Sequence, residues 1–198
     1  MFFLLLFTLI CLKADNEYSL RIAYGKATMS DFSEIMVGNW QGHPKDLYVA
    51  SFDGGYLLKK EYDGMPLDIY AKAGYSHYDE DGMRPNRHEI NAYIKLYWSF
   101  ESLDRAVRFG FGEGFSYTSA ILYTEWLEAT QEKDTNSKFL NYLDVSLDMN
   151  LGKITAHKAL EGVYVGWALK HRSGIFGLIN NVRRGGSNYN TFYVEITF

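Results

Sequence analysis

His171 and Ser173 stand two residues apart near the end of the chain. A neutral imidazole beside a hydroxyl is the smallest unit that activates a Ser nucleophile for attack on a carbonyl group. In a β-strand, residues i and i+2 point to the same side, so the two side chains can lean into hydrogen-bond distance. A His-x-Ser tripeptide is common by chance, and the element that carries it therefore decides what it means.

The segment 162–173 that carries this pair alternates between two faces. Lys170 and Arg172 lie on one face, and the face of His171 and Ser173 is otherwise apolar, with Val163, Val165, Trp167 and Leu169. The same alternation recurs along the chain with turn residues between the segments. It predicts eight strands, at 18–28, 47–59, 67–77, 88–99, 106–117, 139–151, 162–173 and 189–198.

The two faces of these strands predict how they are arranged. The polar faces mix Asp, Glu, Lys and Arg with Gly and Tyr, which suits the filled interior of a small barrel. The apolar faces carry aromatic residues near the strand ends, where a membrane barrel has its girdles. We therefore expect an all-β fold, an eight-stranded antiparallel transmembrane β-barrel. The alternative is a soluble β protein, such as a lipocalin-like binder with an apolar interior.

Composition excludes several other classes. The chain has 198 residues, enough for one domain, and 47% of them are hydrophobic, which excludes a disordered chain. A mean hydropathy of −0.23 and the lack of a long apolar run exclude a helical membrane protein. A net charge of −4 gives no general basic field, so nucleic acid is not an expected partner. We see no metal-ligand spacing, and the chemistry of a His/Ser pair needs no cofactor.

The two ends of the chain predict its route to a membrane. Residues 1–12 are apolar but too short to span a bilayer, which indicates a secretory signal peptide at 1–14 and a barrel domain at 15–198. Cys11 leaves with that signal; the alternative is a buried N-terminal strand. The terminal Phe198 resembles the signal by which outer-membrane barrels engage the barrel-assembly machinery. The location expected is thus the bacterial outer membrane.

The connections between the strands predict two different barrel ends. Links 60–66, 100–105 and 152–161 are short and expected in the periplasm, and links 29–46, 78–87, 118–138 and 174–188 are mostly longer and expected outside. Within the third outer link we expect a helix at 121–131, with its apolar residues at the membrane surface: Ile121, Leu122, Trp126 and Leu127.

Further polar residues share the face and height of His171 and Ser173. Asn141 and Asn188 begin the two strands that flank 162–173, and Glu113 ends the strand one further away. Polar groups facing lipid are costly unless they have partners or a role. Asn188 and Glu113 are the two candidates to orient the imidazole. On the opposite face, Lys170 and Arg172 are expected to point into the barrel and pair with Asp144 or Asp148.

The motifs GFGEGFSY at 110–117, FLNYLDVSLDMNL at 139–151 and LKHRSGIFGLINNVRRGGSNYNTFYVEITF at 169–198 resemble the lipid A 3-O-deacylase family (PagL-type outer-membrane barrels). The resemblance implies an eight-stranded barrel that hydrolyses an ester-linked acyl chain of lipid A in the outer leaflet. It implies His171 and Ser173 as the catalytic pair, and lipid A or lipopolysaccharide and the surrounding lipids as partners.

The chain departs from this family pattern at two places. Gly174 replaces the family's Asn after the Ser, so a backbone N–H would serve the oxyanion, with Asn141 as a neighbouring support. No acid stands at 185–188, which leaves the orienting role to Asn188 or Glu113. Arg183 and Arg184 in the last outer link could meet lipid A phosphates. The alternative function is a non-catalytic outer-membrane barrel with a structural or adhesive role.

Overall fold

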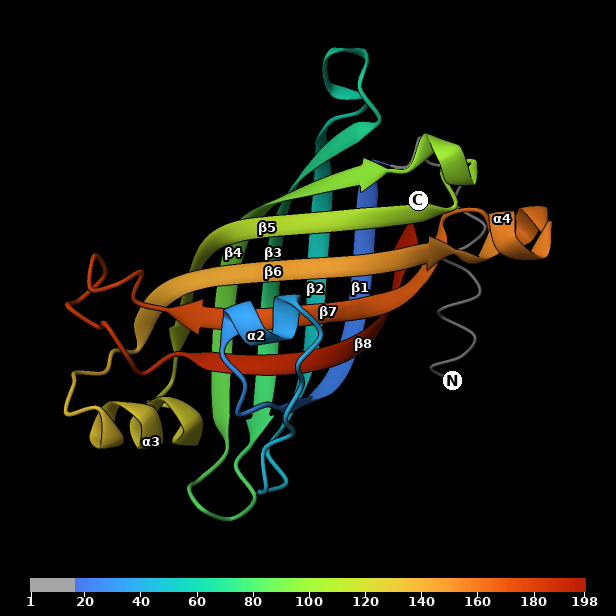
Figure 1. The fold of residues 1–198 in the computed structure, drawn as a ribbon. Helices are drawn as coiled ribbons and strands as arrows, with labels where there is room; N and C mark the ends of the chain where they lie inside the picture. The colour runs from blue at the N-terminus through green and yellow to red at the C-terminus, as the bar shows by residue number, and fades with distance from the viewer. Residues whose placement is uncertain (1–16) are drawn as a thin grey trace.

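A computed structural model describes residues 17–198, so the predicted signal peptide at 1–14 and Cys11 lie outside the described residues. Eight strands form a closed barrel in which each strand pairs antiparallel with its sequence neighbours and β1 with β8 (Figure 1). Every predicted strand is confirmed, with boundaries within two residues. The strands are β1 (Tyr18–Ala27), β2 (Tyr48–Lys59), β3 (Leu67–Asp79), β4 (Arg87–Ser99), β5 (Val107–Thr118), β6 (Phe139–Asn150), β7 (Val163–Ser173) and β8 (Ser187–Thr197).

The two ends of the described chain meet where the barrel closes. The amide of Tyr18 donates to the carbonyl of Phe198 at 3.0 Å, and the amide of Phe198 donates to the carbonyl of Tyr18 at 3.0 Å. This reciprocal pair extends the β1–β8 ladder, which begins at Ser19 opposite Thr197. Closure leaves no unpaired sheet edge, which a barrel in lipid requires because hydrocarbon offers no hydrogen-bond partner.

The lumen is filled with charged and tyrosyl side chains, and the outer wall is apolar. Arg21 bonds Asp144 at 2.7 Å, Lys72 bonds Glu195 at 2.6 Å and Arg108 bonds Asp148 at 2.9 Å, all fully buried. On the outward face, Ile90 and Phe192 are 63% and 70% exposed. A polar interior with an apolar exterior is the arrangement of a membrane barrel and the reverse of a lipocalin-like binder, so the transmembrane fold prediction is confirmed.

The predicted orientation of β7 is confirmed, but the predicted partners of its lumen side chains are wrong. Lys170 and Arg172 are buried in the lumen. Lys170 Nζ donates to Ser76 Oγ at 3.1 Å, and Arg172 pairs with Glu125 at 2.5 Å and Glu89 at 3.3 Å. Asp144 is instead occupied by Arg21 and Lys95, and Asp148 by Arg108. Long side chains cross the lumen, so the nearest strand in sequence does not identify their partners.

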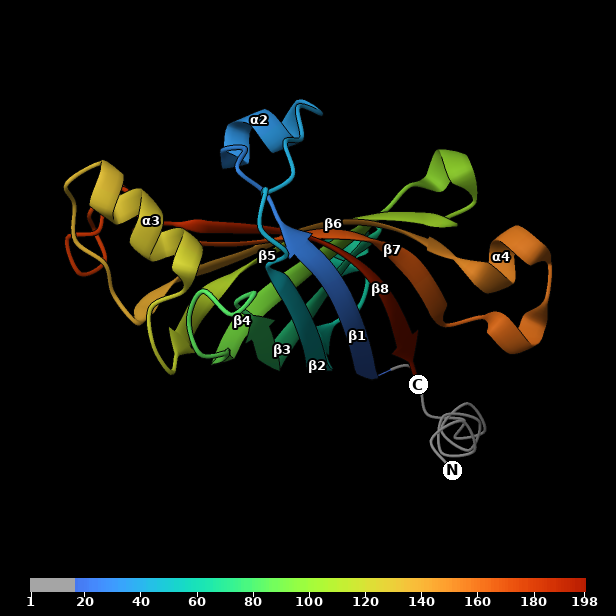
Figure 2. The same cartoon turned by 90° about the horizontal axis from the view of Figure 1, so that it is seen from below.

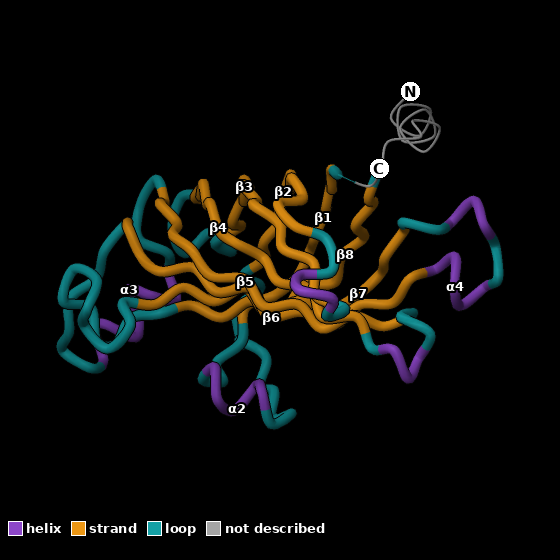
Figure 3. Tube along the Cα trace, turned by 90° about the horizontal axis from the view of Figure 1, so that it is seen from above, coloured by secondary structure: helices purple, strands orange, loops and turns teal. Residues whose placement is uncertain are grey.

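The helices lie outside the strand ladder (Figure 3). The predicted helix is confirmed as α3 (Tyr123–Gln131), but Leu122 is fully buried in an apolar cluster with Leu47, Tyr78 and Tyr189 and does not lie at the membrane surface. Arg172 in the lumen donates to Glu125 of α3 at 2.5 Å, which anchors α3 at one end of the barrel. The sequence did not predict α2 (Phe32–Met36) or α4 (Leu151–Thr155). No helix within 17–198 is both long and apolar enough to cross a membrane.

The two barrel ends differ as predicted. One end, called here the long-loop end, carries loops 28–47, 80–86, 119–138 and 174–186. The other end carries loops 60–66, 100–106 and 151–162, together with the C-terminus and the start of β1. In Figure 2, α3 and α4 stand at opposite ends, and α2 stands outside the barrel wall. Three of the long loops, 28–47, 119–138 and 174–186, therefore surround the end of β7 where His171 and Ser173 lie.

Candidate active site

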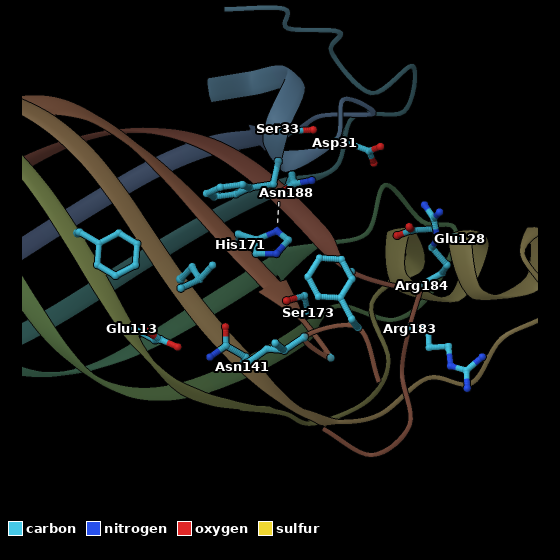
Figure 4. A pocket seen from close by; sticks show the side chains of 17 residues that line it. Asp31, Ser33, Glu113, Glu128, Asn141, His171, Ser173, Arg183, Arg184 and Asn188 are labelled. Atoms are coloured by element: carbon cyan, nitrogen blue, oxygen red, sulfur yellow. Dashed lines mark hydrogen bonds between the residues drawn. The ribbon is translucent and has the colours of Figure 1, made fainter. Parts of the chain in front are cut away.

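His171 is held by a hydrogen bond to Asn188 on the neighbouring strand. The two residues are directly opposite in the β7–β8 ladder, and His171 Nδ1 lies 2.7 Å from Asn188 Oδ1 (Figure 4). Asn188 Nδ2 donates to the carbonyl of Ser30 at 3.1 Å, which fixes the amide with its oxygen toward the imidazole. The imidazole must then carry its proton on Nδ1, and its Nε2 lone pair is left as a base.

Loop 28–47 covers this part of the wall. The ring of Phe32 in α2 packs against the ring of His171 at 5.1 Å between centroids, and Trp40 stacks on Trp167 at 5.2 Å. The Trp167 indole donates to Asn190 Oδ1 at 3.2 Å. These contacts hold α2 on the outer surface of the barrel over β7 and β8, where it shields the imidazole (Figure 1). The sequence predicted this segment only as a loop, because its packing on a distant strand leaves no local pattern.

Ser173, the last residue of β7, shares an open pocket of about 700 Å³ with His171. Its hydroxyl makes no hydrogen bond to His171 or to any other residue within 17–198. The structure thus brings the predicted pair to one pocket without joining them. In unliganded enzymes such catalytic hydrogen bonds are often long and tighten only when the substrate is bound.

Gly174 and Asn141 border Ser173 from two sides. A Cβ on Gly174 would lie 2.0 Å from the carbonyl oxygen of Val182, so only glycine lets loop 174–186 pack this closely. Asn141 lies opposite Ser173 in the β6–β7 ladder. Its Nδ2 donates to the carbonyl of Gly114 at 3.1 Å, and its buried Oδ1 has no partner among the described residues. The unused atom of Asn141 is therefore a hydrogen-bond acceptor, whereas an oxyanion needs donors.

Glu113 lines the same pocket but is not next to the imidazole. It lies opposite Leu143 on β6, and Leu143 lies opposite His171 on β7. Two strand spacings, about 9–10 Å, separate the backbones of Glu113 and His171. Glu113 is exposed and makes no hydrogen bond within the described part of the chain. Of the two predicted candidates to orient His171, the structure brings only Asn188 into contact with it.

Two acids that the sequence analysis missed also line the pocket. Asp31 precedes α2, and Glu128 lies on α3. Burial raises the pKa of Glu128 above its usual value, while hydrogen bonds from the amides of Gly185 and Gly186 act in the opposite direction. Asp31 and Glu128 come from loops 28–47 and 119–138, and no spacing in the sequence links either loop to His171.

Arg183 and Arg184 lie at the rim of this pocket. Their backbone amides donate to Asp134 Oδ2 at 2.8 and 2.5 Å, and hydrogen bonding from these amides and that of Thr135 lowers the pKa of Asp134. In Figure 4 the Arg184 side chain lies beside Glu128, and the Arg183 side chain extends away from His171 and Ser173. Residues 17–198 contain no cluster of three or more His, Cys, Asp or Glu side chains arranged to hold a metal ion.

Comparisons with known proteins identify the type of barrel. No family model matches the chain, and neither does any curated protein. Among solved structures, the outer membrane enzyme PagL superposes with a TM-score of 0.61 at 13% identity, over 91% of this chain and 99% of that one. The N-terminal β-barrel domain of Pseudomonas aeruginosa OprF gives 0.51 at 12% identity, over 92% and 98%. The fold is that of a bacterial outer-membrane barrel, and the apolar wall around a charged lumen agrees with a location in that membrane.

Proposed function

We propose that this barrel hydrolyses an ester-linked acyl chain of a lipid in the outer leaflet, as a lipid A deacylase does. The observation that carries the proposal is the His171–Asn188 hydrogen bond on the lipid-facing wall, within the pocket that also holds Ser173. The hydrogen bond leaves His171 Nε2 available as a base. Ser173, two residues further along β7, has a hydroxyl that bonds no described residue. Polar groups on a lipid-facing wall are costly, so their presence beside a pocket favours a functional role.

The proposed reaction is acyl transfer through Ser173. His171 Nε2 accepts the Ser173 proton as Oγ forms a bond to the ester carbonyl carbon, and the carbonyl oxygen becomes an oxyanion. The residue after Ser173 is Gly174, and its backbone amide bonds no described residue. This amide is the proposed donor to the oxyanion. Collapse of the intermediate breaks the ester bond, and His171 returns its proton to the leaving alcohol oxygen. His171 Nε2 then accepts a proton from water as the water oxygen bonds the acyl carbon. The bond from that carbon to Ser173 Oγ breaks as His171 returns the proton to Oγ, and the fatty acid is released.

The surroundings of the pair favour an acylated, anionic lipid. Phe111 and Leu143 line the pocket on its membrane side, where an acyl chain would lie. Arg183 and Arg184 lie on its loop side, where guanidinium groups suit phosphate oxygens. The same pocket thus offers apolar and cationic surfaces to the two parts of lipid A, the lipid component of lipopolysaccharide.

The test is Ser173→Ala, with Ser99→Ala at the far end of β4 as the matched control. Each protein is refolded in detergent micelles with purified lipid A, and released fatty acid is followed by mass spectrometry. Ser173→Ala should lower the rate by about 10³-fold or more, whereas Ser99→Ala should keep it. Both variants should keep the heat-modifiable migration of a folded barrel. An unchanged rate in Ser173→Ala would refute the proposal.

The second candidate is a non-catalytic barrel. It is favoured by the unbonded Ser173 hydroxyl and by an amide, in place of a carboxylate, beside His171. This candidate predicts that the wild-type protein releases no fatty acid from lipid A of any acylation pattern. Release by the wild type together with loss in Ser173→Ala excludes it.

A further inference from the structure

A pair of histidines lies on the opposite side of the barrel from the pocket. His77 on β3 and His88 on β4 are directly opposite in the ladder, at the long-loop end. In strand order, β3 lies four strands from β7, halfway around the closed barrel. Both side chains are on the outward face, with His88 exposed and His77 half-buried. Neither residue takes part in the proposed hydrolysis.

The two imidazoles turn the same kind of nitrogen toward each other. His77 Nδ1 lies 3.4 Å from His88 Nδ1, with ring centroids 5.0 Å apart. That distance is longer than a good hydrogen bond from an N–H group, which spans about 2.7–3.2 Å. Two imidazole nitrogens at about 2.05 Å from one tetrahedral metal ion lie about 3.3–3.4 Å apart. The observed separation therefore matches two ligands of a shared ion.

The groups around the pair would rearrange around such an ion. The Tyr75 hydroxyl lies 2.6 Å from His88 Nδ1, a hydrogen bond that an ion on this nitrogen would displace, because two ligands of one tetrahedral ion lie about 3.3 Å apart. On the far side of the other ring, Asn86 Nδ2 lies 3.3 Å from His77 Nε2. An ion on His77 Nδ1 moves that ring's proton to Nε2. A half-turn of the Asn86 amide supplies the oxygen to accept it, and gives up the 3.3 Å hydrogen bond that Asn86 Oδ1 accepts from the Glu80 amide.

We infer that His77 and His88 form a two-histidine site for a divalent transition metal, completed by water, with the Tyr75 hydroxyl as a polar neighbour. Imidazole nitrogen selects zinc, copper and nickel over the magnesium and calcium ions that oxygen ligands prefer. Cu²⁺ and Zn²⁺ are the probes of choice, with Cu²⁺ the tighter binder. The bound ion would link β3 to β4 next to loop 80–86.

The experiment titrates CuCl₂ or ZnCl₂ into the full barrel in detergent micelles, without an affinity tag, by isothermal titration calorimetry at pH 7.5. The wild type should bind one ion per chain. His77→Asn and His88→Asn should each weaken binding by more than about tenfold, since the loss of even an outer-shell partner costs about 10–100-fold. His157→Asn, in loop 151–162, is the matched control and should bind as the wild type does.

Spectroscopy separates this site from adventitious binding. The electron paramagnetic resonance spectrum of bound Cu²⁺ should show two equivalent nitrogens in the wild type and one in either variant. Unchanged affinity in the His77→Asn/His88→Asn double variant, or no saturable binding by the wild type, would overturn the inference. Acyl release should be the same in the double variant and the wild type, so failure of this inference and failure of the proposed function are distinguishable.

Discussion

Strand β7 carries two kinds of polar residue on its two faces. Lys170 and Arg172 point into the lumen, where Arg172 bonds Glu125 and Glu89. His171 and Ser173 alternate with them along the strand and face the pocket on the outer wall. Lys170 and Arg172 both have hydrogen-bond partners in the lumen, whereas the Ser173 hydroxyl bonds no described residue. Under the proposed function, the difference separates polar groups that hold the barrel together from polar groups that act on a ligand.

The same contrast extends to the neighbouring strands. In the lumen, Asp144 accepts bonds from Arg21 and Lys95 and thereby ties three strands together. On the outer wall, Asn141 bonds only Gly114 and keeps its Oδ1 unpartnered. An unsatisfied buried acceptor costs free energy. Ser146 Oγ and Asn91 Oδ1 in the lumen also lack a described partner, so the paired charges, and not full satisfaction, distinguish the lumen from the pocket. Removal of a lumen group should therefore affect stability, and removal of a pocket group should affect chemistry.

The largest effect is expected from His171→Asn on the pocket side. Loss of the base should reduce acyl release by about 10³-fold or more. The free energy of unfolding should fall by only about 1 kcal/mol, because the imidazole contributes one hydrogen bond and its contact with Phe32. Fatty-acid release and urea unfolding in micelles measure the two. If stability fell by several kcal/mol while activity persisted, His171 would belong with the lumen residues.

A lumen pair should give the opposite result. Lys72→Met leaves Glu195 buried without its cation and should lower the free energy of unfolding by about 3–5 kcal/mol. Lys72→Met/Glu195→Gln should recover most of that loss, because the Gln side chain keeps an acceptor for the Tyr97 hydroxyl. Acyl release per folded molecule should not change in either variant. Equal stability of the single and double variants would contradict this account.

The strands were predictable because lipid imposes a strict rule. Each outward residue of a membrane barrel meets hydrocarbon, so alternation persists along whole strands, and β7 and β8 were located within two residues. The face of His171 and Ser173 followed from the same parity. The contact between His171 and Asn188 was one of two predicted alternatives, because parity gives face and height but not which neighbouring strand supplies the partner.

The remaining features depend on contacts that no local pattern encodes. Leu122 was expected at the membrane surface but lies among Leu47 and Tyr78, because α3 folds inward over the lumen. Asp31 reaches the pocket because Phe32 and Trp40 dock loop 28–47 on β7. Such docking depends on surfaces that exist only after the barrel has closed. Residue spacing alone therefore predicts the strands but not how the loops pack on them.

A smaller effect should distinguish the two residues first considered as partners of His171. Asn188→Ala removes the acceptor of the Nδ1 proton, which fixes the tautomer and orientation of the base, and should lower kcat by about 10-fold or more. Asn188→Asp keeps an acceptor and should retain more activity than the Ala variant. Glu113→Ala should stay within about twofold of wild type, because Glu113 lies two strands away. A larger loss in Glu113→Ala than in Asn188→Ala would reverse the assignment.

The smallest effect concerns Glu80, a fully buried carboxyl next to the lumen mouth whose Oε1 has no described partner. Burial raises its pKa from the ordinary 4.5 to about 7, although the Tyr123 amide donates to Oε2 at 2.7 Å. Between these two pH values the folded protein holds a proton that the unfolded chain has lost. Stability should therefore fall as pH rises from about 4.5 to about 7 and stay level above.

Glu80→Gln removes this titration and keeps an oxygen for the Tyr123 amide. The loss of unfolding free energy between pH 5 and pH 8 should then be smaller than in the wild type by about 1 kcal/mol or more. Urea unfolding at both pH values measures it, with Glu132→Gln on the exposed surface as the control. If Glu80→Gln kept the wild-type pH dependence, Glu80 would be ionised in the folded state at pH 5. Glu80 would then resemble the lumen acids that are ionised and paired with cations. Its unpartnered Oε1 would not destabilise the folded state.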